Sequence, residues 1–177
     1  MKSMGSRRIP GHRAASLVVA AMAVLAGCTY GFSGGGGFPS DVRTLYIAPF
    51  ENRTVQFDLE QQLFAKLQEE LPRSLGVRPG SEAAADAVLR GRITGYTDVA
   101  QNYRPGEAGS VNVVQHQVSI TIAIEIIHVE RNEILWESQS LSGRGEYRPD
   151  SQTDEVARAL ALESLVQQIV DGAQSQW

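Results

Sequence analysis

The chain contains very little cysteine and histidine. Cys28 is its only cysteine, so no disulfide can form within one copy, although small exported domains are often held together by disulfides. There are three histidines, and none belongs to a His-Glu-x-x-His zinc motif. The first absence excludes a disulfide-stapled scaffold and leaves the fold dependent on a hydrophobic core. The second gives no support to a metal site, and we expect no cofactor.

Long apolar runs are also missing. Residues 14–27 are almost wholly apolar, but a transmembrane helix needs roughly 20 apolar residues. Four basic residues and no acid precede this stretch: Lys2, Arg7, Arg8 and Arg13. A basic start, a short apolar stretch and small residues at its end are typical of a secretory signal peptide. We therefore predict that residues 1–27 are a signal peptide.

The signal segment ends in Val24-Leu25-Ala26-Gly27-Cys28, which resembles a bacterial lipobox. The resemblance implies that Cys28 becomes the N-terminus and that its sulfur carries a lipid with palmitate-type acyl chains. Each buried CH₂ contributes about 0.8 kcal/mol to membrane attachment, so two or three chains form a stable anchor. Enteric lipoproteins that are retained at the inner membrane have Asp after the lipidated cysteine, whereas this chain has Thr29. We therefore expect the protein to be anchored to the outer membrane, on its periplasmic side. A chance cysteine behind an ordinary signal peptide is the alternative.

A glycine-rich stretch separates this cysteine from the rest of the chain. Gly34–Gly37 are four consecutive glycines, which is the composition of a flexible tether. A phosphate-binding loop is the alternative, but no Lys-Ser/Thr follows the glycines. We therefore divide the chain into a signal peptide (1–27), a lipidated cysteine with its tether (28–40) and a single domain (41–177).

Basic residues are scarce after the signal segment. Twelve Lys and Arg stand against twenty acids there, a formal net charge of −8. This balance argues against nucleic-acid binding and against general attraction to anionic membranes. Only Lys66 is a lysine and the other eleven are arginines, which bind phosphates and carboxylates bidentately. An acidic ligand would therefore need a local arginine patch.

The apolar pattern predicts four strands and two helices. Strands are expected at 44–50, 87–99, 116–128 and 134–144, and helices at 56–70 and 154–171. We expect a loop at 101–110. Pro72 and Gly76 are expected to end the first helix, and Ser151-Gln152-Thr153-Asp154 resembles a capping box for the second. The order β-α-β-β-β-α predicts an α+β fold, a mostly antiparallel sheet of about four strands with two helices packed on one face.

Three segments are similar to the lipopolysaccharide-assembly lipoprotein family (LptE). They read Cys28-Thr29-Tyr30-Gly31-Phe32-Ser33-Gly34, Leu45-Tyr46-Ile47-Ala48-Pro49-Phe50-Glu51-Asn52-Arg53-Thr54 and Ala85-Asp86-Ala87-Val88-Leu89-Arg90-Gly91-Arg92-Ile93. The resemblance implies a non-catalytic role in delivering lipopolysaccharide to the outer leaflet. It also implies that the domain plugs a large β-barrel partner (LptD), helps that barrel to fold and contacts lipopolysaccharide. The middle segment also resembles curli-secretion and penicillin-binding-protein-activator lipoproteins, so a module of that type is the alternative.

Arg90 and Arg92 are the candidate lipopolysaccharide-binding residues. They lie two apart on the expected outward face of the strand at 87–99, with Tyr96 on the same face. Two guanidiniums about 7 Å apart could clamp phosphates. Surface arginines paired with acids of neighbouring strands are the alternative. Arg144 and Arg148 form a second, weaker candidate.

Other polar and aromatic residues are expected to be structural. His116 and His128 fall on the apolar register of the strand at 116–128, with no second cysteine or zinc motif beside them. We therefore predict that the protein is not an enzyme. A periplasmic lipoprotein enzyme that uses these histidines is kept as a third hypothesis. Trp136 is expected in the core or an interface. Asn52 and Arg53 are expected to hold the turn after the first strand.

Overall fold

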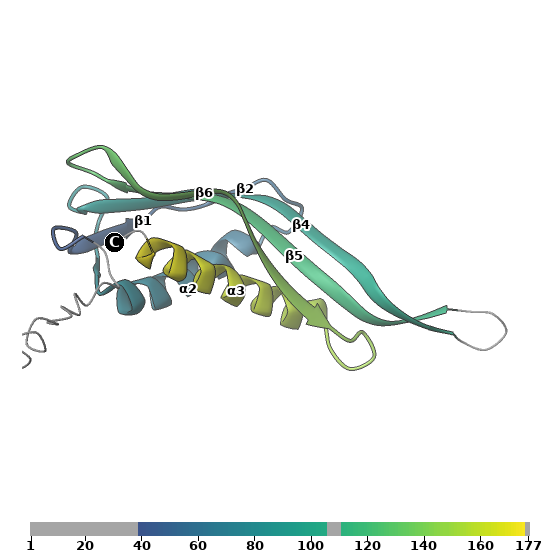
Figure 1. Ribbon diagram of the computed structural model, residues 1–177. Helices are drawn as coiled ribbons and strands as arrows, with labels where there is room; N and C mark the ends of the chain where they lie inside the picture. Colours follow the sequence, from purple (N-terminus) through teal and green to yellow (C-terminus); the bar gives the residue numbers. More distant parts are fainter. Residues whose placement is uncertain (1–38, 106–110, 176–177) are drawn as a thin grey trace, which may run out of the picture. The chain divides into compact units, whose positions relative to one another are not determined.

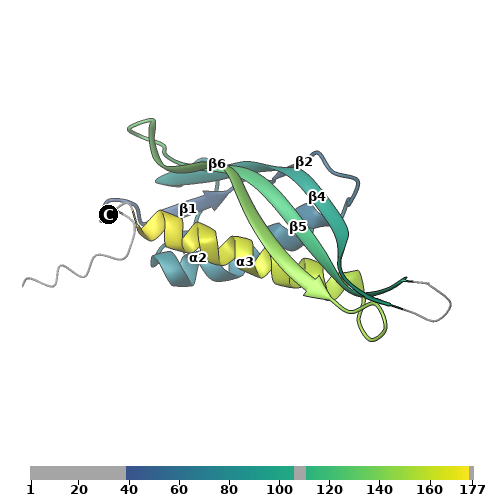
Figure 2. The same ribbon diagram turned by 45° about the vertical axis from the view of Figure 1, so that its right-hand side comes forward.

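A computed structural model describes residues 39–105 and 111–175. These residues belong to one compact unit, in which two helices lie side by side over one face of a sheet (Figures 1 and 2). The predictions for residues 1–27, Cys28 and Gly34–Gly37 lie outside the described residues. No helix in the described part is long and apolar enough to cross a membrane.

The sheet is mixed and has six strands. Its order is β3-β1-β4-β5-β6, and β2 pairs with β4 outside this path. The elements in chain order are β1 (Thr44–Ile47), β2 (Glu51–Asn52), α2 (Leu59–Leu75), β3 (Arg78–Pro79), β4 (Ala87–Pro105), β5 (Val111–His128), β6 (Glu133–Tyr147) and α3 (Asp154–Gln174). The two helices and the antiparallel β4-β5-β6 part agree with the predicted α+β fold.

The prediction of about four, mostly antiparallel strands is only partly right. β1 runs parallel to β4 and to β3, and β2 also runs parallel to β4. Parallel strands need a crossover connection, which α2 supplies between β1 and β3. β2 and β3 have two residues each, too few for an alternation of apolar residues to appear in the sequence.

The alternation predicted for the long strand is confirmed. Val118, Ile120, Ile122 and Ile126 of β5 are fully buried in the core. The loop expected at 101–110 is wrong for its first part, because β4 continues to Pro105 and pairs there with Val111 of β5. Polar residues without alternation still pair, since the ladder bonds come from the backbone.

α2 extends beyond its predicted end. Its buried leucines continue through Leu71 to Leu75, and Pro72 lies inside the helix instead of ending it. A proline in a helix removes one backbone donor, but the burial of the leucines on either side of it favours continuation. Gly76 ends the helix as predicted, at φ 69°, a conformation that glycine adopts without steric cost.

α3 packs on β6 through small residues. A Cβ at Gly143 would lie 2.1 Å from the carbonyl oxygen of Ala161, so the helix backbone comes very close to the strand. The predicted apolar stripe is therefore partly wrong: Ala161 is buried, whereas Val156 and Leu160 are 40% and 46% exposed. The capping box is also wrong, because Thr153 makes no side-chain cap hydrogen bond.

Trp136 belongs to the hydrophobic core, in agreement with one of its two predicted positions. Its ring lies against Gly172 of α3, where a Cβ would come within 2.5 Å of the indole. This contact is the third place where a glycine allows α3 and β6 to meet closely, after Gly143 and Gly145. The close packing of α3 on β6 therefore depends on glycine at these three positions.

A β-bulge in β4 reverses the direction of the side chains that follow it. The register with β5 shifts between Ile93 and Gly95, and one extra residue turns the next side chains to the opposite face. Tyr96 therefore packs against the core from the helix-covered face. The prediction that Tyr96 shares the outward face with Arg90 and Arg92 is wrong for this reason.

Candidate functional site

Arg90 and Arg92 lie on the face of β4 that the helices leave uncovered. Both side chains are exposed, and they alternate with Leu89 and Ile93, which are fully buried under the helices. Because both arginines precede the bulge, the predicted alternation holds for them. The structure therefore brings the two predicted site residues together on one accessible surface.

Arg90 is held by an acid of the neighbouring strand. It lies opposite Glu125 of β5, and its Nε donates to Oε1 of that carboxylate at 2.6 Å. The two side chains are 59% and 30% exposed, so water reaches the pair. The alternative given above, a surface arginine paired with an acid of a neighbouring strand, thus describes Arg90 in this structure.

Arg92 makes no ion pair with the acid beside it. Its two cross-strand neighbours are Ala123 of β5 and Glu51 of β2. Arg53 already donates to both oxygens of Glu51, at 2.9 and 3.0 Å. These hydrogen bonds are the main cause that lowers the pKa of Glu51, and the charge of Arg92 adds to the shift. Arg92 forms no hydrogen bond or ion pair with any other residue in the described ranges.

A small polar hollow lies between the two arginines. Its volume is about 70 Å³, and it is lined by Arg90, Gly91, Arg92, Ala123, Ile124, Glu125 and Gln139. Its charged and amide side chains, those of Arg90, Arg92, Glu125 and Gln139, suit a phosphate group better than an acyl chain. Gln139 donates to Glu137 at 3.1 Å on its rim.

The second arginine pair does not join the first. Arg144 lies opposite Ser119 on β5, six residues along the strand from Glu125 and therefore about 20 Å from Arg90. Arg148 lies in the loop after β6, where its backbone N–H donates to Gln152 Oε1. The structure therefore gives Arg144 and Arg148 no shared site with the Arg90 hollow.

An apolar surface that was not predicted lies along β1 and α2. Two adjoining hollows of about 330 and 270 Å³ share Pro49 and Phe64 in their lining. The nearby loop before α2 exposes Val55 and Phe57, which are 79% and 85% exposed. Scattered apolar residues in a loop and on a helix flank leave no periodic pattern, so this surface could not be predicted from the sequence.

Hydrogen bonds from the Asn52 side chain hold that loop. The backbone N–H and the hydroxyl of Thr54 both donate to Asn52 Oδ1, at 2.9 and 2.8 Å, and Asn52 Nδ2 donates to the carbonyl of Gln56 at 2.7 Å. Such an Asx turn fixes the chain locally. The predicted turn-holding role of Asn52 is confirmed, and Arg53 contributes through its ion pair with Glu51.

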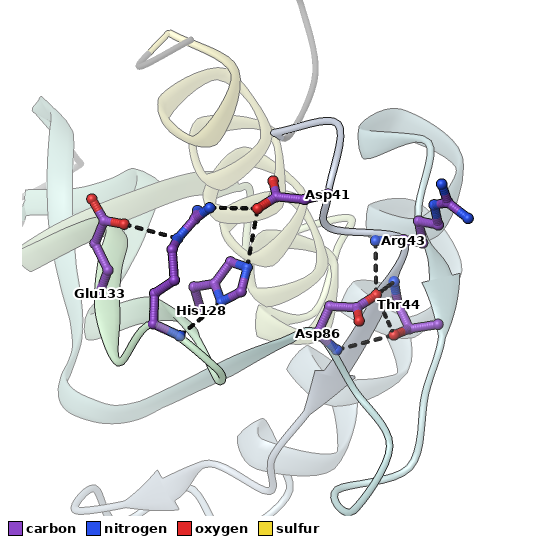
Figure 3. A network of polar contacts seen from close by, with 7 residues as sticks. Asp41, Arg43, Thr44, Asp86, His128 and Glu133 are labelled. Atoms are coloured by element: carbon purple, nitrogen blue, oxygen red, sulfur yellow. Dashed lines mark hydrogen bonds and ion pairs between the residues drawn. The ribbon is translucent and has the colours of Figure 1, made fainter.

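His128 connects the N-terminal segment to the sheet (Figure 3). The ring is 4% exposed, its Nε2 lies 3.4 Å from Asp41 Oδ2, and its Nδ1 accepts from the backbone N–H of Arg131 at 3.3 Å. Arg131 also pairs with Asp41 and with Glu133. Desolvation alone would raise the pKa of Asp41, but the hydrogen bonds and cations outweigh it and lower the pKa.

Asp86 ties the start of β1 to the start of β4 (Figure 3). Its Oδ2 accepts from the backbone N–H groups of Arg43 and Thr44, each at 2.9 Å, and from the Thr44 hydroxyl at 2.8 Å. The hydroxyl bond is the largest cause that lowers the pKa of Asp86, followed by the two backbone bonds. Asp86, in the segment Ala85-Asp86-Ala87 that resembles the LptE family, thus has a structural role.

His116 of β5 belongs to a polar cluster with Asp98 of β4 and Tyr147 of β6. Its Nδ1 lies 2.7 Å from Asp98 Oδ1, and the Tyr147 hydroxyl donates to Asp98 Oδ2 at 2.9 Å. Burial, followed by this hydrogen bond, raises the pKa of Tyr147 to about 12. The bulge after Ile93 places Asp98 on this face, so the sequence alternation could not reveal the cluster.

These contacts link strands and do not form a recognisable catalytic or metal arrangement. Asp98, His116 and Tyr147 come from β4, β5 and β6, so the cluster joins three neighbouring strands. No group of three or more His, Cys, Asp or Glu side chains within 39–105 and 111–175 is placed to hold a metal ion. The geometry favours the structural role predicted for both histidines.

Comparison with known proteins identifies a family and a fold. The family model described as LptE, lipopolysaccharide-assembly, matches residues 42–174. No curated protein sequence matches the chain. The solved structure of hypothetical protein CT253 from Chlamydia trachomatis matches with a TM-score of 0.54 and 11% identity, over 76% of this chain and 97% of that chain. At this identity the match shows a shared fold only.

Two further solved structures are lipoproteins or assemblies with lower scores. PelC from Paraburkholderia phytofirmans, a dodecamer, matches with a TM-score of 0.48 and 16% identity, over 79% of this chain and 94% of that chain. Lipoprotein GNA1162 from Neisseria meningitidis matches with a TM-score of 0.44 and 11% identity, over 73% and 99% of the two chains.

Proposed function

Since the chain belongs to the LptE family of lipopolysaccharide assembly, we propose that it is an outer-membrane lipoprotein subunit of the lipopolysaccharide translocon. The family match carries this proposal, because it spans nearly the whole described domain. The family's role is assembly and not catalysis, so the protein needs no catalytic residues or cofactor.

The lipid anchor supplies the location in this proposal. Cleavage after residue 27 leaves Cys28 as a lipidated N-terminus, with acyl chains that hold the protein at the outer membrane on its periplasmic side. The tether at 28–40 then gives the domain reach from the membrane surface.

The partner in this proposal is a large LptD-like β-barrel that the domain plugs and helps to assemble. The interior of a large outer-membrane barrel is polar. The uncovered face of the sheet has matching chemistry, with hydroxyl, amide and charged side chains that include Thr121, Ser142, Gln117, Arg92 and Arg144. A plug must present such a surface to a water-filled lumen.

Contact with lipopolysaccharide is assigned in this proposal to Arg90 and Arg92. Their guanidiniums flank a polar hollow on the accessible face of the sheet, and guanidinium groups suit the oxygens of phosphate. Arg92 makes no ion pair with any residue in the described part of the chain. The acyl chains of the ligand would need an apolar surface elsewhere, because charged and amide side chains line the hollow.

Affinity purification of the full lipoprotein from native membranes tests the assembly role. We expect a large β-barrel to co-purify, and depletion of the lipoprotein should leave that barrel misassembled and remove lipopolysaccharide from the cell surface. Normal surface lipopolysaccharide after depletion would contradict the proposal.

The same purification addresses the alternative, another outer-membrane lipoprotein module of secretion-pore or penicillin-binding-protein-activator type. The segment from Ala48 to Thr54 resembles those lipoproteins as well, and it includes the hydrogen-bonded turn that precedes the exposed Val55 and Phe57. A co-purified penicillin-binding protein, or a ring of identical copies, would favour that alternative.

A further inference from the structure

We propose that Glu125 is a built-in competitor for the anion site, so that a phosphate group binds Arg92 first and Arg90 only after it has displaced Glu125. This inference rests on the proposed contact of Arg90 and Arg92 with lipopolysaccharide. It assigns different roles to two arginines that look equivalent in the sequence.

The first step follows from the neighbours of Arg92. Ala123 on one side carries no charge, and Glu51 on the other side is bound through both oxygens by Arg53. Arg92 can therefore accept an anion without breaking an existing ion pair. It is the cation that is available when the site is empty.

The second step follows from the contact of Arg90. Its Nε lies 2.6 Å from Glu125 Oε1, and the same carboxylate lines the hollow between the two arginines. A ligand that uses both guanidiniums must take the place of this carboxylate at Arg90. Exchange is feasible because Arg90 is 59% exposed, and an exposed ion pair contributes little free energy.

A phosphate monoester has the chemistry to win this exchange. It carries a charge of about −1.5 to −2 and three acceptor oxygens near neutral pH, whereas a carboxylate carries one charge and two oxygens. The hollow is open to solvent and is lined by both guanidiniums, so a phosphate group can reach them. Glu125 would also keep the empty site from binding weaker anions, because it neutralises one of the two guanidiniums.

The experiment measures equilibrium binding of the full mature lipoprotein in detergent to bisphosphorylated lipid A, to its dephosphorylated form and to inorganic phosphate. Glu125→Gln removes the competing charge and should tighten binding of bisphosphorylated lipid A about two- to fivefold, the range expected for an exposed pair. The matched control is Glu69→Gln, which removes an equal charge from an exposed Arg73–Glu69 pair on α2 and should leave affinity unchanged.

Two further variants test the order of contacts. Arg92→Ala should weaken binding more than Arg90→Ala, because Arg90 is already paired with Glu125, whereas the acid next to Arg92, Glu51, is bound by Arg53. In the Arg90→Ala background, Glu125→Gln should give a smaller gain than in the wild type, since it then removes only the repulsion between this carboxylate and the phosphate and releases no arginine. A gain with inorganic phosphate as well as lipid A would identify any phosphate as the ligand, whereas a gain confined to lipid A would identify the lipid headgroup. Either gain supports the competition.

The results separate this inference from the proposed function. If Glu125→Gln binds no more tightly than Glu69→Gln, or if its gain is as large without Arg90 as with it, the competition is overturned. In that case the two arginines can still prove necessary for binding, and the proposed contact with lipopolysaccharide then stands without the competition. If neither arginine affects affinity and dephosphorylated lipid A binds equally well, the proposed contact of Arg90 and Arg92 with lipopolysaccharide fails, and the competition fails with it.

Discussion

Gly145 of β6 lies directly against the backbone of Ala157 in α3. A Cβ at Gly145 would stand 2.0 Å from the Ala157 carbonyl oxygen and 2.8 Å from its carbonyl carbon. Heavy atoms do not approach so closely, and a helix backbone cannot move aside as the end of a flexible side chain can. The position of α3 on the sheet therefore depends on a missing methyl group.

Gly145→Ala should consequently destabilise the domain. Overpacking against backbone typically costs about 1–3 kcal/mol, and we expect the upper part of that range in urea unfolding. Gly95→Ala is the matched control, because the nearest atom to its new methyl group is Thr121 Cβ at 3.6 Å. Equal unfolding free energies for the two variants would contradict the close packing of α3 on β6.

Asp86→Asn should remove part of the acid sensitivity of the fold. The folded-state pKa of Asp86 is lowered, chiefly by the Thr44 hydroxyl and two backbone N–H groups. Its stabilising effect is therefore present above the unfolded-state pKa and is lost as the pH falls through the folded-state pKa. The variant should be less stable than wild type near neutral pH, and the difference should shrink in strong acid. Unfolding curves at several pH values measure this.

A control for Asp86 is available in Asp150→Asn, which changes an exposed acid in the loop after β6. We expect this variant to keep nearly the wild-type unfolding free energy at neutral pH, because the side chain is exposed. If Asp86→Asn and wild type give parallel curves from neutral to acid pH, the hydrogen bonds around Asp86 do not favour its ionised form.

Asp98→Asn should lower the pKa of Tyr147 toward its ordinary value. Burial and the hydrogen bond to Asp98 raise that pKa to about 12, and the substitution removes the negative charge beside the phenol. Tyr147 stabilises the wild-type fold fully below its unfolded-state pKa near 10, and the effect is lost as the pH rises toward about 12. Ultraviolet titration of tyrosinate, with Tyr147→Phe to assign the signal, measures the shift. An unchanged titration in Asp98→Asn would be inconsistent with this contact.

The double variant Arg90→Ala, Arg92→Ala should weaken lipopolysaccharide binding without unfolding the domain. Both side chains are exposed, so we expect the unfolding free energy to change by no more than about 0.5 kcal/mol. Loss of two charge-assisted contacts should weaken affinity about tenfold or more. Arg73→Ala on α2 is the control, since it removes an exposed arginine on the other layer. Unchanged affinity in the double variant counts against the site.

The buried faces could be predicted because they depend on local alternation. The isoleucines of β5 and the leucines of α2 repeat with the period of a strand and of a helix, and each set lies in the core. The errors have equally local causes. A bulge after Ile93 reversed the following side chains, and glycines in β6 changed which side of α3 faces the sheet.

The candidate site was predictable only in part. Arg90 and Arg92 share a face because they are two residues apart on a strand, which the sequence states directly. Their partners depend on which strands lie beside β4 and in what register. The parallel strand β2 was not predicted, so neither Glu51 nor the Arg53 that binds it could be placed next to Arg92.

By itself, the sequence determined two helices, a long alternating hairpin, an acidic surface and a resemblance to lipopolysaccharide-assembly lipoproteins, because these are properties of neighbouring residues and of composition. Tertiary structure alone decided that Glu125 pairs with Arg90 and that the acid beside Arg92, Glu51, pairs with Arg53 instead. The physical reason is strand register: a shift of one residue would place different side chains opposite the two arginines, and register arises only when distant segments pack together.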